Sequence, residues 1–159
     1  MKELFLSNPS IIIFLHVISA VVWVGGMIAI RFAVHYSMQN IDEPKIKLAR
    51  TLENLKRFFS MVIPAILILL ITAIMMILGL ELKATPLYKF ALIKEVIWTV
   101  MTLIFIYIYI RRAQAQKYFD RGELPLAKAR LEPIGKIFIP INIILGLVAI
   151  FLGVTLRGF

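Results

Sequence analysis

Two ionisable side chains lie in or beside long apolar runs of this sequence, and they are the residues best placed to do chemistry. His16 lies in the run 11–30, which holds no other ionisable residue. Lys94 and Glu95 directly precede the uncharged run 96–110. An ionisable side chain in apolar surroundings is costly, about 2.5 kcal/mol or more at the centre of a bilayer. Each is therefore expected to have a partner or a function.

The residues that follow His16 predict a pocket on one helix face. Trp23 lies seven residues after His16, which is about two helical turns, so the two share a face. Gly25 and Gly26 have no side chain and permit close approach of another helix or of a flat cofactor. A neutral imidazole inside a helix bundle is also the commonest axial ligand of haem. The alternative is a tightly packed helix whose histidine bonds to a neighbouring backbone.

Lys94 is predicted to reach the same depth as His16. His16 lies about six residues inside the first run and Lys94 about eight after Pro86, so both reach roughly 8–12 Å at 1.5 Å per residue. Trp98 shares a helix face with Lys94, whereas Glu95 points about 100° away. We therefore expect His16, Lys94 and Trp98 to line one pocket. The alternative is that Lys94 extends its amine to the membrane surface or pairs with Glu95.

His35 is the second of two histidines. It lies nineteen residues from His16, about 28 Å along a helix, so one haem cannot be ligated by both within one chain. We expect His35 and Arg31 to lie at the cytoplasmic end of the first helix in a simple interface role, where they bind a headgroup, a haem propionate of a second site, or nothing.

Methionines and one asparagine complete the candidate polar and soft ligands. Soft thioether ligands suit copper, but the five methionines in or near the apolar runs form no Met-x-x-Met cluster, so packing is expected. They are Met27, Met61, Met75, Met76 and Met101. Asn142 is expected to form a hydrogen bond between helices.

The composition places these residues in a membrane protein. Hydrophobic residues make up 61% of the 159, against about 45–50% in a soluble domain. The absence of cysteine excludes disulfides, thiolate metal sites and cysteine-attached haem. The net charge of +9 falls in loops between apolar runs, which favours orientation in a membrane over nucleic-acid binding.

The pattern of apolar runs predicts an all-α integral membrane four-helix bundle, with one domain over 1–159. Its spans are expected at about 11–33, 59–80, 87–111 and 134–156, since about 20 residues cross a bilayer. Basic residues concentrate in the first and third loops, so these loops are expected in the cytoplasm and both termini on the outer, periplasmic side. The expected location is thus the bacterial inner membrane.

The cytoplasmic loops are predicted to be helical extensions of the spans. Pro44 after Glu43 indicates a helix start. Gly122 and Pro125 indicate a break in the third loop, and Pro133 a start for the last helix.

Three stretches resemble a superfamily of bacterial membrane proteins that includes CopD-type copper resistance domains and HemJ-type protoporphyrinogen oxidases. The first is Leu15–His16 through Trp23–Val24–Gly25–Gly26, of which the last four residues are closer to the CopD-type pattern. The second is Arg57–Phe58–Phe59–Ser60, and the third is Thr85–Pro86–Leu87–Tyr88 followed by Ala91–Leu92–Ile93–Lys94. Their order and spacing agree along nearly the whole chain. After Gly26 the sequence departs from the HemJ-type pattern.

The resemblance implies haem b, with His16 as axial ligand and Lys94 as second ligand or charge partner. Trp23, Gly25 and Gly26 would shape the pocket. Such a protein would exchange electrons with a quinone or another membrane redox protein, or act as a protoporphyrinogen-oxidase-like oxidoreductase, and a homodimer is compatible with it. The alternatives are a CopD-like copper transport protein and a non-catalytic membrane subunit.

Overall fold

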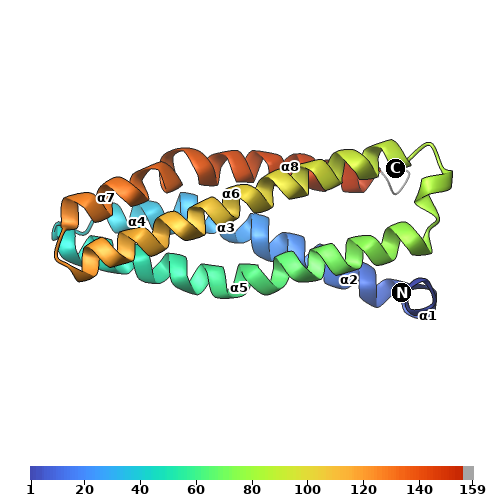
Figure 1. Ribbon diagram of the computed structural model, residues 1–159, viewed down its shortest axis with the longest axis horizontal. Coiled ribbons are helices and arrows are strands. Elements are labelled where there is room, and N and C mark those ends of the chain that lie inside the picture. Colours follow the sequence, from blue (N-terminus) through green and yellow to red (C-terminus); the bar gives the residue numbers. More distant parts are fainter. Residues whose placement is uncertain (156–159) are drawn as a thin grey trace.

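The computed structural model describes residues 1–155, which form helices and short connections without a strand. Four long helical segments lie side by side in an elongated bundle (Figure 1). They are Pro9–Gln39, Pro44–Gly79, Tyr88–Asp120 and Leu124–Thr155, and each is long and apolar enough to cross a membrane. The predicted all-α four-helix architecture is therefore confirmed.

Two of these segments, the first and the fourth, contain short turns of wider, π-helical geometry. The first segment consists of α2 (Pro9–Ala20), η1 (Val21–Gly25), α3 (Gly26–Ala29), η2 (Ile30–Val34) and α4 (His35–Gln39). The second is α5 (Pro44–Gly79), the third is α6 (Tyr88–Asp120), and the fourth consists of α7 (Leu124–Pro133), η4 (Ile134–Phe138) and α8 (Ile139–Thr155). The turns η1, η2 and η4 are π-helical. A short helix α1 (Lys2–Ser7) precedes the bundle, and a 3-10 turn η3 (Leu82–Ala84) connects α5 to α6.

Proline and glycine set most of the helix boundaries. Pro44 begins α5 directly after Glu43, as the sequence predicts. Gly122 adopts a positive φ of 77° between α6 and α7, a conformation that glycine adopts without steric cost. The predicted helix start at Pro133 is wrong, because this helix already begins at Leu124. A proline removes one backbone hydrogen bond, and the π-helical turn that follows Pro133 accommodates the loss without ending the helix.

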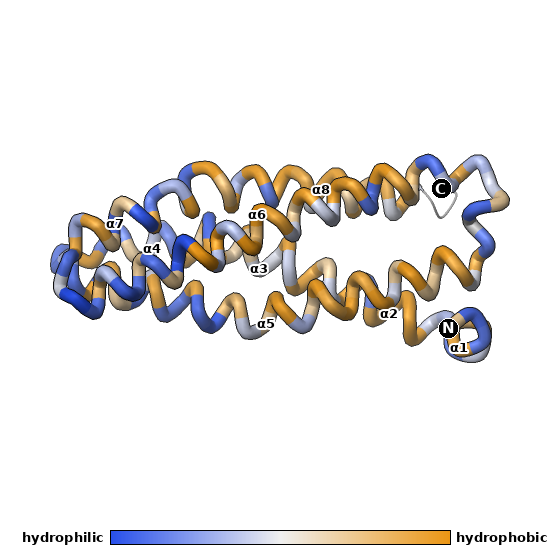
Figure 2. The backbone as a smooth tube through the Cα atoms, in the orientation of Figure 1, coloured by the Kyte–Doolittle hydropathy of each residue, from blue (hydrophilic) through white to orange (hydrophobic). Residues whose placement is uncertain are grey.

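The helices are longer than the predicted spans. Segments of 31 to 36 residues measure about 47–54 Å at 1.5 Å per residue, whereas the hydrocarbon core of a bilayer is about 30 Å thick. The additional turns lie at the end of the bundle that contains α4 and α7, where hydrophilic residues gather (Figure 2). The predicted helical extensions are thus present. We call this end the basic end; α1 and the end of α8 lie at the opposite, terminal end (Figure 1).

The bundle is built from two helix pairs. Towards the terminal end, α2 packs mainly on α5 and α6 mainly on α8, and in Figure 1 the two pairs diverge there. The main apolar core lies in the middle and towards the basic end, and its most buried members include Trp23, Leu52, Val62 and Ile134. Many large apolar side chains remain exposed on the outside of the bundle.

Polar contacts within the α6–α8 pair and at the terminal end add to this packing. Asn142 is fully buried and its Nδ2 donates to the Met101 carbonyl oxygen at 3.2 Å, so the predicted bond between helices is confirmed. At the terminal end, Lys2 of α1 donates a hydrogen bond to the Glu81 carboxylate, which holds the pKa of Glu81 below its usual range. Phe5 of α1 packs where a Cβ at Gly79 would clash.

Candidate functional site

His16 is held by α5 in one tautomer. Its half-buried ring places Nδ1 at 2.9 Å from the Thr72 hydroxyl oxygen. That hydroxyl has one hydrogen, which it donates to the Ile68 carbonyl oxygen at 2.6 Å. In the tautomer that agrees with this bond, His16 Nδ1 donates to the Thr72 hydroxyl oxygen and Nε2 keeps its lone pair. Metal-binding histidines are commonly oriented by a hydrogen bond that the other ring nitrogen donates.

Lys94 lies on α6 with its amine against α8. An added Cβ at Gly153 would lie only 2.9 Å from Lys94 Nζ, so the amine fills the space that this glycine leaves. Within residues 1–155, Lys94 makes neither a hydrogen bond nor an ion pair. Its neighbour Glu95 is exposed, and the pairing considered from the sequence is not formed. The Lys94 amine is thus half-buried without a fixed polar partner.

His16 and Lys94 lie in one region of the bundle although they belong to different helix pairs. Gly146 of α8 lies against Val24 of the first segment, and from that contact Gly153 and His16 both lie about 10–12 Å further towards the terminal end. His16 belongs to the α2–α5 pair and Lys94 to the α6–α8 pair, which diverge at this end (Figure 1). The two helix pairs thus carry an imidazole, held against α5, and an amine, held against α8, at similar depth.

Two tryptophans present buried N–H groups near this region and in the core. Trp98 lies one helical turn after Lys94, and its Nε1 is buried without a hydrogen-bond partner in the described residues. Trp23 is 1% exposed, its Nε1 is likewise unpaired, and its ring packs edge-on against Phe105 at 6.4 Å between centroids. An unpaired buried N–H costs about 1–3 kcal/mol. Trp98 is therefore a candidate ligand contact, whereas the ring of Trp23 serves the core.

The two glycines after Trp23 have different surroundings. A Cβ at Gly26 would lie 2.6 Å from Phe58 Cε2, so Gly26 serves close packing between the first segment and α5. Gly25 is exposed, and the nearest atom to its added Cβ is 4.0 Å away in Val21. The sequence predicts that the glycine pair admits either another helix or a flat cofactor. Gly26 admits a side chain of a neighbouring helix, Phe58 of α5.

Thr72 and Gly153 are functional candidates that the sequence reasoning missed. Thr72 is the one hydroxyl-bearing residue in the apolar run 61–80, which was an available signal for a polar contact. Gly153 follows Gly146 by seven residues and therefore lies on the same helix face. A Cβ at Gly146 would lie 2.5 Å from Val24 Cγ2, so both glycines admit a neighbouring side chain.

The methionines belong mainly to the packing of the bundle. Met27 and Met101 are buried in the main core, and Met75 is buried with Phe5 in a smaller cluster. Met61 is 60% exposed on the apolar outer surface. Within residues 1–155, no three side chains of His, Asp or Glu gather as a metal site. The packing role predicted for these methionines is therefore confirmed for the three buried ones.

His35 lies far from His16 along the first segment, at the basic end. It is exposed on α4, and its Nε2 lies 3.3 Å from the side-chain nitrogen of Gln39. The two histidines thus occupy separate sites, as the helical rise predicts.

Comparisons of the chain with protein-family models, curated proteins and solved structures found no match. Gly26 and Phe58, from two of the three stretches that resemble CopD-type and HemJ-type proteins, contact each other. The resemblance to that superfamily stays a hypothesis, and the function is argued from the site.

Proposed function

We propose that this protein crosses a bilayer four times and binds b-type haem between its two helix pairs. The membrane placement is supported by four apolar helices and by large exposed apolar side chains such as Phe14, Val96 and Phe151. Lipid stabilises such a surface and water does not. By the positive-inside rule, the basic end faces the cytoplasm and the termini face the outer side of a bacterial inner membrane.

The observation that carries the haem proposal is the hydrogen bond between the His16 ring and Thr72. In the tautomer in which Nδ1 donates to Thr72, Nε2 would offer its lone pair to haem iron in a defined direction. The donor set on the opposite pair fits the same group. Lys94 provides an amine without a fixed polar partner, and Trp98 a buried N–H that lacks an acceptor.

These residues would divide the work of holding the haem. Thr72 would set the ring orientation of His16 and would make Nε2 a stronger electron-pair donor to iron. Lys94 would be either a second iron ligand, which requires a neutral amine, or the charged partner of a propionate. Trp98 Nε1 would donate to a propionate oxygen. Haem supplies a one-electron couple, and electrons would pass to or from a quinone or another membrane redox protein.

The proposal is tested by an absorption spectrum of protein purified in mild detergent from haem-replete cells. The expected result is a Soret band, with the sharpened visible bands of b-type haem after reduction with dithionite. Colourless protein would contradict the proposal.

The role of Lys94 is tested by Lys94→Arg, which keeps the charge but is not expected to ligate iron. A shifted spectrum assigns Lys94 as an iron ligand, and an unchanged spectrum assigns it as a charge partner. Lys89→Arg is the matched control, since Lys89 is exposed one turn earlier on α6. If Lys94→Ala keeps its full haem content and an unchanged spectrum, Lys94 is not part of the site.

A further inference from the structure

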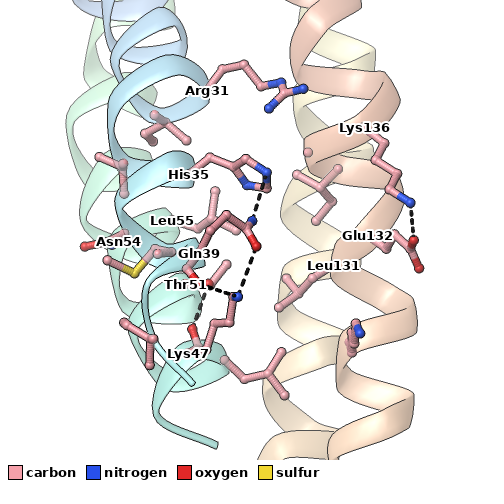
Figure 3. Close-up of a pocket in the computed structure, with 18 of the residues that line it drawn as sticks. Arg31, His35, Gln39, Lys47, Thr51, Asn54, Leu55, Leu131, Glu132 and Lys136 are labelled. Carbon is pink, nitrogen blue, oxygen red and sulfur yellow. Dashed lines mark hydrogen bonds and ion pairs between the residues drawn. The ribbon is translucent and has the colours of Figure 1, made fainter. Parts of the chain in front are cut away.

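A cavity of about 560 Å³ lies at the basic end, away from His16 and Lys94. One side of the cavity is formed by the end of the first helical segment and by α5. The other side is formed by the start of the last segment (Figure 3). Its inner wall is apolar and includes Ile30, Val34, Leu131 and Ile134. The cavity is therefore amphipathic, because basic side chains line it as well.

The charges around the cavity favour an anion. Four cationic side chains line it, against two acidic ones. The cations are Arg31, Lys47, Lys128 and Lys136, and the acidic residues are Asp42 and Glu132; the imidazole of His35 also lines the cavity. Glu132 is already paired with Lys136. The acidic side chains thus leave an excess of positive charge in the cavity.

Arg31 is the basic residue with the most unused hydrogen-bonding capacity. It is half-buried, and within residues 1–155 it makes no hydrogen bond or ion pair; its guanidinium lies 6.0 Å from the Phe32 ring centroid. In Figure 3 the side chains of Arg31 and His35 extend across the cavity towards the last helical segment. Arginine presents several donors in a fixed geometry that matches a phosphate group.

Two of the three π-helical turns lie at this cavity. η2 carries Arg31, and η4 carries Gly135 and Lys136, all of which line it. Such turns are costly in an α-helix and frequently occur at functional sites. A Cβ at Gly135 would meet no atom within 4 Å, so the space beside this glycine is open.

We propose that this cavity binds the headgroup of an anionic phospholipid. The basic side chains would contact the phosphodiester, and the apolar wall would contact the glycerol and upper acyl chains. The lining of the cavity extends from polar residues such as Asp42 and Lys128 to apolar residues such as Ile30 and Ile139, as in the basic pockets between helices that bind such headgroups. The proposal rests on the membrane placement proposed above but not on haem.

The test is a titration of the purified protein in neutral detergent, in which the melting temperature is followed as phosphatidylglycerol is added. Phosphatidylcholine and glycerol 3-phosphate are titrated in parallel. We expect phosphatidylglycerol alone to raise the melting temperature in a saturable manner. Arg31→Gln should weaken the apparent affinity about tenfold, as expected for a lost charge-assisted hydrogen bond. Arg121→Gln is the control, because Arg121 is an exposed cation of the α6–α7 turn that does not line the cavity.

Gly135→Leu supplies a second test that leaves every charge in place. It should fill the open space and abolish the phosphatidylglycerol effect, while the haem spectrum stays unchanged. Equal effects of phosphatidylglycerol and phosphatidylcholine, or equal affinities of Arg31→Gln and Arg121→Gln, would overturn the proposal. A saturable rise in melting temperature with glycerol 3-phosphate would show that the cavity binds a soluble phosphate ester and not a lipid.

Discussion

At the scale of single residues, the polar side chains in the apolar part of the bundle differ in how they are satisfied. Asn142 Nδ2 and His16 Nδ1 each have one defined partner on another helix. Lys94 has none in the described residues and rests against the bare backbone of Gly153. An uncompensated amine in such surroundings is costly, which is a reason to assign it a ligand rather than a packing role.

Thr72→Val tests the orientation of His16 with almost no change in side-chain volume. It removes the acceptor of the Nδ1 hydrogen bond and should lower haem occupancy or shift the spectrum. The expected loss of stability is about 0.5–1.5 kcal/mol, measured by thermal unfolding in detergent. Thr99→Val is the matched control, because the Thr99 hydroxyl is exposed and bonds only to the Glu95 carbonyl of its own helix. Equal effects of the two variants would contradict the role assigned to Thr72.

Only some residues of the proposed haem site could be predicted from the sequence. The similar depth of His16 and Lys94 follows from counting residues along straight helices, and the contact between Gly146 and Val24 agrees with it. Thr72 and Gly153 could not be assigned as their partners, because contacts between helices depend on how each helix is rotated about its axis. A single sequence does not fix that rotation for uniformly apolar helices. For the same reason, the sequence does not reveal that Gly26 packs against Phe58 of α5.

At the scale of the helices, glycine and proline have effects that depend on their surroundings. Pro44 and Gly122 act at boundaries, where their backbone preferences decide the outcome, so both positions were predictable. Pro133 was not, because the π-helical turn after it absorbs the missing hydrogen bond and the helix continues. Periodicity along the sequence does not reveal such turns.

Gly146→Ala tests the close packing of α8 against the first segment. The added Cβ would lie 2.5 Å from Val24 Cγ2, and overpacking of this kind costs about 1–3 kcal/mol. Gly135→Ala is the control, because its Cβ would meet no atom within 4 Å. Thermal unfolding should show a lower midpoint for Gly146→Ala alone, and a midpoint equal to that of the control would contradict the packing.

At the scale of the whole molecule, charge and length divide the bundle into two ends. The helices exceed the thickness of a bilayer, and their surplus turns lie at the basic end (Figure 2). The proposed haem site and the proposed lipid cavity would then lie towards opposite faces of the membrane. This separation predicts that substitutions in the cavity leave the haem spectrum unchanged.

The orientation can be tested directly because the chain contains no cysteine. Lys83→Cys and Arg121→Cys place single thiols at exposed positions of opposite ends. A membrane-impermeant maleimide added to intact cells should label Lys83→Cys, and should label Arg121→Cys only after the membrane is permeabilised. The reverse pattern would invert the orientation, and labelling of both in intact cells would contradict a membrane-spanning bundle.

The central claim is that His16 ligates haem iron, and the most direct measurement compares the spectra of His16→Ala and His35→Ala. Both remove one histidine from the same helical segment, but only His16 has its Nδ1 fixed by Thr72. The account predicts loss of the Soret band in purified His16→Ala and its retention in His35→Ala. An unchanged Soret band in His16→Ala would contradict it.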